Sequence, residues 1–185
     1  MGKTHGLTLG KFAPLHKGHQ LVIETALAET NEVSVIIYDA PETTPIPLNI
    51  RSNWLRRLYP QAKIIEAWDG PTEVGDTLEI KRKHEKYIIN DLKVSGITHF
   101  YSSEFYGEHM SAVLGANNRL VNPSRDIVPI CGGQIRENPF LYREYILSKR
   151  FPAPLIYAFA HRELANPESA QRSKLFQQEC NHQSQ

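Results

Sequence analysis

One ten-residue stretch decides the predicted fold: Gly10-Lys11-Phe12-Ala13-Pro14-Leu15-His16-Lys17-Gly18-His19. The apolar residues 7–10 predict a strand, and the helical spacing of apolar residues over 21–28 predicts a helix. A helix N-terminus offers unpaired N–H groups and a partial positive charge, and both favour anions. Because His16 and His19 are three residues apart at this junction, we expect both rings to face a phosphate bound there.

The composition is that of an ordinary globular domain. The 185 residues are 41% hydrophobic and 22% charged, which suits one domain with a sizeable core. A net charge of +1 gives no field that would favour nucleic acid. Cys131 and Cys180 imply no disulfide framework, and no apolar run reaches the ~18 residues of a membrane span. We therefore expect a cytoplasmic protein that binds neither nucleic acid nor a membrane.

Segments that predict strands and helices alternate along the chain. The β-branched run 32–39 is typical of a buried parallel strand, and further strands are predicted at 62–67, 97–102 and 119–121. Helices are predicted at 49–59, 76–92, 105–114 and from the 131–136 segment to about Lys149. This alternation predicts an α/β fold, a Rossmann-like doubly wound parallel sheet of about five strands with flanking helices.

Residues 1–150 are predicted to form this domain, and the pattern decays from Phe151 onward. We expect residues 151–185 to be an extension that packs on the domain or trails from it. The apolar run 155–160 is of uncertain type, and the polar, Gln-rich residues 166–185 predict a solvated helix or a frayed tail. No G-x-x-x-x-G-K-[ST] pattern follows Phe151, so no kinase site for ATP is expected there.

The opening stretch has all six specified positions of the pattern G-x-F-x-P-x-H-x-G-H. It resembles the signature of the nucleotidyltransferase superfamily, and it is far more specific than a lone glycine motif. The alternative is a turn glycine with one hydrogen-bonded histidine and one histidine that caps the helix. Gly10 and Gly18 would let the backbone approach a phosphate closely. The resemblance implies an ATP site that also includes Lys11 and Phe12.

A second motif is Ile130-Cys131-Gly132-Gly133-Gln134-Ile135-Arg136. It resembles the family's I-S-x-T-x-I-R loop, whose arginine grips nucleotide phosphates through a planar, permanently charged guanidinium. Cys131 and Gly133 depart from the family's serine and threonine, so both hydroxyl donors are lost. Backbone N–H groups of Cys131, Gly132 and Gly133 can still cradle a phosphate. The alternative for Arg136 is an ordinary arginine on a helix surface.

Three further segments narrow the resemblance: Ser102–Gly107, Val121–Arg125 and Arg136–Arg143. With them, residues 4–151 resemble the nicotinamide-mononucleotide (NMN) adenylyltransferase domain of the bacterial bifunctional NAD-biosynthesis proteins of NadR type. The resemblance implies that ATP and NMN react to give NAD and pyrophosphate. It further implies that His16 and His19 stabilise the transferring phosphate while Lys11 and Arg136 neutralise the β- and γ-phosphates. Mg²⁺ would be carried mainly by the ATP phosphates, without a metal site made by the protein.

The NMN side is less easily interpreted from sequence. In related enzymes a residue at the position of Arg51 holds the NMN phosphate, and the alternative here is a solvated helix arginine. Trp68 is expected to stack on the pyridinium ring, whereas Trp54 lies on an apolar helix face and is expected in the core. The candidate NMN residues are Tyr38, Asp39, Arg51, Trp68, Ser102, Ser103 and Glu104.

Two other functions remain open at this stage. One is a nucleotidyltransferase with another phosphate acceptor, or with CTP in place of ATP. The other is a catalytically weakened module that senses nucleotides, which the departures at Cys131 and Gly133 favour. The sequence leaves the oligomeric state open, a homo-oligomer included.

Overall fold

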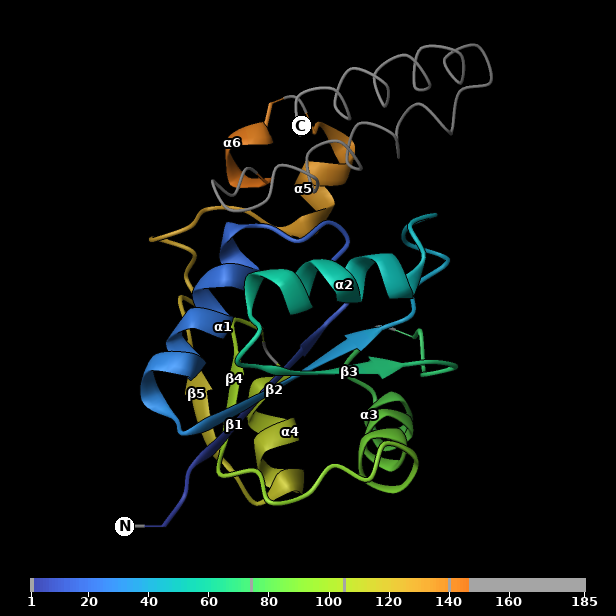
Figure 1. Ribbon diagram of the computed structural model, residues 1–185. Coiled ribbons are helices and arrows are strands. Elements are labelled where there is room, and N and C mark those ends of the chain that lie inside the picture. Colours follow the sequence, from blue (N-terminus) through green and yellow to red (C-terminus); the bar gives the residue numbers. More distant parts are fainter. Residues whose placement is uncertain (1, 74, 105, 140, 147–185) are drawn as a thin grey trace.

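The computed structural model describes residues 2–73, 75–104, 106–139 and 141–146. The predictions for the extension 151–185 lie outside these residues. A single parallel sheet of five strands, in the order β3-β2-β1-β4-β5, forms the centre of the fold (Figure 1). Its strands are β1 (His5–Gly10), β2 (Glu32–Tyr38), β3 (Lys63–Ala67), β4 (His99–Ser102) and β5 (Asn117–Leu120).

Helices cover both faces of the sheet (Figure 1). One face carries α1 (Lys17–Glu29) and α2 (Leu48–Leu58), and the other carries α3 (Leu78–Lys86), the π-helical turn η1 (Tyr87–Asp91) and α4 (Gly107–Leu114). The short helices α5 (Gly132–Glu137) and α6 (Arg143–Ile146) lie beyond α1 and α2, and α6 contacts α1. The predicted doubly wound α/β fold is confirmed.

The interior strand β2, between β3 and β1, shows why the sheet needs helices on both sides. Successive side chains of a strand point to opposite faces. Val33, Val35 and Ile37 accordingly join the core under α1 and α2, while Ile36 and Tyr38 join the core on the α3 and α4 side. A strand buried on both faces is apolar at nearly every position, which is the pattern seen in its sequence.

The strand order places a crevice at one edge of the sheet. From β1 the chain continues to β2 and β3 on one side, and it later returns to β4 and β5 on the other side. Loops that leave β1 and β4 therefore diverge to opposite faces, and open α/β sheets bind ligands at such a point. The loop after β1 is the histidine motif, and the loop after β4 begins at Ser103.

Two helix boundaries differ from prediction. The helix predicted over 76–92 is α3 followed by η1. The single helix predicted to reach about Lys149 is wrong, because α5 ends at Glu137 and Asn138 adopts φ −144° and ψ 79°. Pro139 explains the break, since proline disfavours the helical conformation of the residue before it. Gly115 does end α4 with a left-handed φ of 62°, as glycine commonly does.

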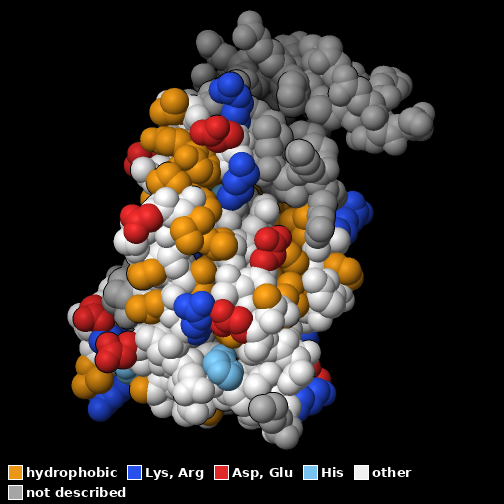
Figure 2. All heavy atoms as spheres, turned by 90° about the vertical axis from the view of Figure 1, so that its left-hand side faces the viewer, with side chains coloured by type: hydrophobic (Ala, Val, Ile, Leu, Met, Phe, Trp, Pro, Cys, Tyr) orange, Lys and Arg blue, Asp and Glu red, His pale blue; other side chains and the backbone are white. Residues whose placement is uncertain are grey.

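The surface carries charges of both signs. On the face drawn in Figure 2, Lys and Arg side chains alternate with Asp and Glu and are interrupted by small hydrophobic clusters. Among the described helices, none combines the length and the apolar character needed to cross a bilayer.

Candidate active site

A cavity of about 500 Å³ opens at the carboxyl edge of the sheet. Loops after β1, β2, β3 and β4 form its walls, together with α3, α4 and the start of α5. Most of the predicted site residues line it: Gly10, Lys11, Phe12, His16, Gly18, His19, Tyr38, Ser102, Ser103, Glu104, Cys131, Gly132, Gly133 and Arg136. Asp39, Arg51 and Trp68 do not belong to its lining.

The two histidines stack on each other at the start of α1. Their ring centroids are 3.7 Å apart with 30° between the ring planes. His16 is the N-cap of α1, and its Nδ1 accepts a hydrogen bond from the backbone N–H of Gly18 at 3.1 Å. A Cβ on Gly18 would lie 2.9 Å from Cε1 of His16, so this position needs glycine for the ring to fold back onto the helix. In the neutral ring the proton is therefore on Nε2, where it can be donated to a ligand.

Both histidines are neutral at neutral pH. Burial first, and then the charges of Arg125 and Arg136, together lower the pKa of His16 to about 4. Burial also lowers the pKa of His19 well below its usual value, with His16 and the two arginines adding to the effect. Nδ1 of His19 is buried and has no hydrogen-bond partner among the described residues. The pair can thus donate hydrogen bonds without carrying charge, and it retains one polar atom for a ligand.

Arg136 reaches across the cavity wall to the histidine loop. Its Nη1 donates a hydrogen bond to the backbone oxygen of Ala13 at 2.5 Å. Gly132 makes this approach possible, because a Cβ there would lie 3.1 Å from the same Nη1 and 3.9 Å from Nε2 of His16. Arg136 is therefore part of the cavity wall, and the alternative of an ordinary surface arginine is wrong.

The altered loop keeps a helix start in spite of its lost hydroxyls. Cys131 is the N-cap of α5, and its backbone N–H donates to Oε1 of Gln134 at 3.0 Å. One of the three N–H groups predicted to cradle a phosphate is therefore already paired. Gly133 does not need a positive φ, and among the described residues a Cβ added there would meet only Sγ of Cys131, at 3.8 Å.

Lys11 and Phe12 are the first residues of the histidine loop, directly after β1. The ammonium of Lys11 pairs with Glu42 at 2.6 Å and with Oγ1 of Thr43 at 3.1 Å. Phe12 has a φ of 48°, and its ring packs on His19 with centroids 4.8 Å apart. Phe12 thus buries one side of the histidine stack.

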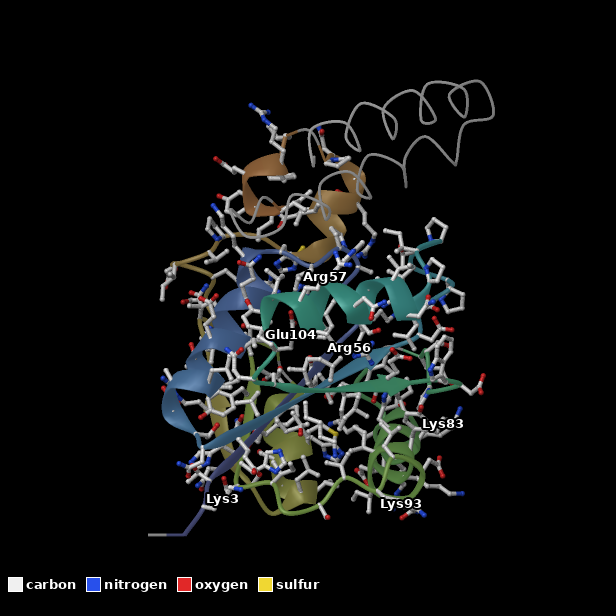
Figure 3. All side chains as sticks on the ribbon, in the orientation of Figure 1. Lys3, Arg56, Arg57, Lys83, Lys93 and Glu104 are labelled. Carbon is white, nitrogen blue, oxygen red and sulfur yellow. The ribbon has the colours of Figure 1, made fainter. Side chains whose placement is uncertain are left out.

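The residues after β4 are engaged with the protein itself. The hydroxyl of Ser103 donates to the backbone oxygen of Val121 at 2.5 Å, and that of Ser102 donates to the oxygen of Glu104 at 3.3 Å. Figure 3 shows Glu104 near the middle of the molecule, away from Lys3 and Lys93 at the end opposite α5. Its carboxylate pairs with Arg125 at 2.8 Å.

Arg51 is buried and holds backbone segments together. Only 1% of its side chain is exposed, so the alternative of a solvated helix arginine is wrong. Its guanidinium donates to the backbone oxygens of Lys11, Tyr38 and Ile46 at 2.5, 2.9 and 2.9 Å, and Oδ1 of Asp39 lies 3.4 Å away. These contacts fasten the loops after β1 and β2 to α2 beside the cavity.

The two tryptophans differ in environment. Trp54 is 3% exposed, so its predicted place in the core is confirmed. Trp68 is half exposed, and its indole N–H donates to Oε2 of Glu66 at 3.0 Å. Stacking of Trp68 on a pyridinium ring stays a prediction.

Arg125 is a functional candidate that sequence reasoning missed. It lines the cavity, and it acts electrostatically on both histidines. It adopts a left-handed φ of 60°, and its guanidinium donates to the oxygen of Ile130 and to Glu104, both at 2.8 Å. Its position in the Val121–Arg125 segment was the available signal, because that segment carries the family resemblance.

Among the described residues, no group of three or more His, Cys, Asp or Glu side chains is arranged to hold a metal ion. The cavity instead presents neutral imidazoles and two guanidinium groups. This donor set suits an anion such as a phosphate chain.

Comparisons with known proteins agree with this site. No family model matches the chain. The trifunctional NAD biosynthesis/regulator protein NadR of Escherichia coli (strain K12) is 32% identical, over 78% of this chain and 39% of NadR. The protein of the same name from Salmonella typhimurium is 27% identical over the same shares. The chain therefore spans about two fifths of the length of these curated relatives.

Solved structures show the same fold. An NadR protein in complex with NAD and AMP-PNP superposes with a TM-score of 0.54 at 21% identity, covering 78% of this chain and 44% of that one. A bifunctional NMN adenylyltransferase/ADP ribose pyrophosphatase from Francisella tularensis gives 0.56 at 14% identity, covering 81% and 45%.

The sequence similarity to NadR shows that the chain contains an NadR-like domain, which places it among the nucleotidyltransferases. The solved structures show that this domain shares its fold with proteins of the NMN adenylyltransferase type.

Proposed function

We propose that this domain transfers the adenylyl group of ATP to NMN, forming NAD and releasing pyrophosphate. The observation that carries the proposal is the stacked, neutral pair of His16 and His19 in a cavity that also holds Arg125 and Arg136. The similarity to NadR over 78% of the chain supports the choice of acceptor.

The chemistry requires positioning more than proton transfer. An oxygen of the NMN phosphate attacks the α-phosphorus of ATP, and the bond from that phosphorus to the oxygen bridging the α- and β-phosphates breaks. The attacking oxygen is already ionised, so no strong base is needed, and catalysis consists of alignment and stabilisation of negative charge. Neutral imidazoles suit this task, since each has one N–H that can donate a hydrogen bond to the transferring phosphate, and the ring does not have to change its protonation state.

The cationic residues have separate roles. Arg136 and Arg125 neutralise the β- and γ-phosphates, and their hydrogen bonds to Ala13 and Ile130 hold the guanidinium groups in place. Lys11 contributes positive charge at the mouth of the cavity, balanced in part by Glu42. The carboxylates of the lining, Glu73 and Glu104, are both paired with cations, so Mg²⁺ would be held chiefly by phosphate oxygens. When bound, Mg²⁺ would offset phosphate charge and favour departure of pyrophosphate.

The test is NAD formation from NMN and ATP by the wild type and by His19→Ala. If His19 stabilises the transferring phosphate, kcat should fall on the order of 10²-fold while KM for NMN changes little. His5→Ala is a matched control, because His5 starts β1 at the end away from the cavity, hydrogen-bonds Ser34 of β2 and does not line the cavity. Near-normal turnover of a folded His19→Ala protein would refute the assigned role.

A second candidate is a nucleotide-binding module without turnover. The missing hydroxyls at Cys131 and Gly133 favour it. It requires tight binding of ATP or NAD by wild-type protein that releases no pyrophosphate, so calorimetry beside the same assay separates the two functions.

A further inference from the structure

Tyr38 carries a buried hydroxyl that nothing in the described protein satisfies. The residue ends β2, is 5% exposed and lines the cavity. Its hydroxyl is enclosed and has no hydrogen-bond partner among the described residues. Because an unpaired buried polar group destabilises a fold, such a group calls for an explanation, and a ligand is one.

The ring of Tyr38 is held on several sides. A Cβ on Gly70 would lie 3.0 Å from Cδ1 of Tyr38 and 3.0 Å from Cε1 of Tyr87, so the loop after β3 packs tightly on both rings. The His84 ring lies edge-on, with centroids 5.8 Å apart. The hydroxyl of Tyr87 donates to the backbone oxygen of Trp68 at 2.5 Å. Of two neighbouring tyrosines, one therefore uses its hydroxyl internally and the other does not.

We call this region the α3 end of the cavity, defined by Tyr38, Ile80, His84, Ile88 and Met110. It lies on the α3 and α4 face of the sheet, whereas the histidine stack lies at the start of α1 on the other face. The lining residues His19 and Tyr38, at opposite ends of the cavity, thus each carry a buried polar atom without a hydrogen-bond partner among the described residues, which are Nδ1 of His19 and the hydroxyl of Tyr38.

The charges around the α3 end are already paired. Lys81 contacts Asp76 at 2.5 Å, and Glu73 contacts Lys83, labelled on α3 in Figure 3, at 2.8 Å. Burial raises the pKa of Tyr38, so the phenol stays protonated and can both donate and accept. A carboxylate entering this end would meet no unpaired cation among its described lining residues, while an uncharged group with a donor and an acceptor would satisfy Tyr38.

We propose that the Tyr38 hydroxyl binds an uncharged polar substituent, of the carboxamide kind, on the aromatic ring of the acceptor nucleotide. Tyr38 is then a specificity-determining residue, and the acceptor ring lies at the α3 end while the phosphates lie at the histidine stack. This inference rests on the proposed function, because it takes the acceptor to be a pyridine mononucleotide.

The test compares wild type, Tyr38→Phe and Tyr87→Phe with two acceptors, NMN and its analogue in which a methyl group replaces the carboxamide. Wild type should lose about tenfold or more in kcat/KM from NMN to the methyl analogue. In Tyr38→Phe this loss should shrink to less than about threefold, because the hydroxyl that distinguishes the acceptors is gone. Tyr87→Phe removes a hydroxyl that is already used, so it should keep the wild-type ratio. Wild type should also discriminate against nicotinate mononucleotide.

Melting of the ligand-free proteins gives a readout independent of activity. Tyr38→Phe should melt no lower than wild type, since it removes an unpaired group, whereas Tyr87→Phe should melt lower. A lower melting temperature for Tyr38→Phe would show that its hydroxyl has a partner in the free protein and would overturn the inference. Equal NMN-to-methyl ratios in wild type and Tyr38→Phe would overturn it as well.

The outcome separates this inference from the proposed function. If wild type binds NMN but releases no pyrophosphate, the proposed function fails alone, and the ratio of dissociation constants for the two acceptors still tests Tyr38. If wild type forms NAD and Tyr38→Phe keeps the wild-type ratio, the inference fails alone.

Discussion

Replacing Gly133 by threonine should improve this domain if its altered loop still binds a phosphate chain. The position lacks the hydroxyl that the family's threonine supplies. Its backbone has no positive φ, and in the described part of the chain an added Cβ would meet only Sγ of Cys131, at 3.8 Å. Threonine therefore fits there without a steric conflict with the described residues.

Two effects set the size of the gain. A hydrogen bond from a hydroxyl to a charged group contributes roughly 1.5–3 kcal/mol, which corresponds to about 10–150-fold in binding or rate. Gly133 lies inside α5, where glycine costs about 0.5–1 kcal/mol relative to alanine, and threonine recovers part of that. We expect Gly133→Thr to raise kcat/KM for ATP by about tenfold or more.

Two control variants isolate the cause. Gly133→Ala restores backbone stiffness without adding a hydroxyl. It should therefore raise the melting temperature without giving the gain in kcat/KM for ATP that is expected of Gly133→Thr. Gly132→Ala should lower activity, because its Cβ would lie 3.1 Å from Nη1 of Arg136 and would displace the guanidinium that bonds Ala13. The assay is initial-rate pyrophosphate release at varied ATP, run beside a thermal melt.

A Gly133→Thr protein with lower activity and unchanged melting would refute the reasoning. It would mean that a ligand packs against the missing side chain, in a pose that differs from the one assumed. Equal gains in Gly133→Thr and Gly133→Ala would also refute it, because the hydroxyl would then be irrelevant.

Two further predictions follow from buried groups. His16 has a folded-state pKa of about 4 against an ordinary value of 6.5. Between these pH values the unfolded chain therefore binds more protons than the folded protein. The free energy of unfolding should fall by about 3 kcal/mol as the pH drops through that window. Urea unfolding at pH 7, 5.5 and 4.5 checks this, and His16→Asn, which keeps a capping side chain, should flatten the dependence. Arg51→Met leaves three backbone oxygens without their donor and should lower the free energy of unfolding by about 3 kcal/mol or more. Arg56, labelled in Figure 3, is the control, because its side chain is 45% exposed beside Glu66. Arg56→Met should lower the free energy of unfolding by less than about 1 kcal/mol. A pH-independent stability, or equal losses in the two arginine variants, would contradict these assignments.

The fold was predictable because two sequence patterns agree with it. The alternation of strand and helix segments indicates a parallel sheet, and the continuous apolar run of β2 indicates a strand in the interior of that sheet, buried on both faces. The error lay at Asn138 and Pro139, where helical spacing on both sides hid a break that proline itself signals. The end of a helix depends on the conformation of one or two residues, whereas a periodic pattern is judged over many residues and does not show such a local break.

The candidate site was predictable where a motif brings residues together along the chain. Both histidines, Arg136 and the Gly132–Gly133 pair do meet in one cavity. Arg51 was harder, because its partners are backbone oxygens from three separate segments, and no sequence pattern records those. Arg125 was missed for a related reason, since its left-handed φ and its contact with Ile130 arise from the loop's path.

The buried guanidinium of Arg51 has a consequence for how such a domain can be altered. It grips main-chain oxygens at Lys11, Tyr38 and Ile46, so it is indifferent to the side chains that those segments display. Side chains of the cavity wall that lie outside the core can therefore be changed while the backbone under them stays fastened. A directed-evolution library aimed at new acceptors should keep Arg51 and vary Ile80 and His84 at the α3 end, because Tyr38, Ile88 and Met110 belong to the buried core.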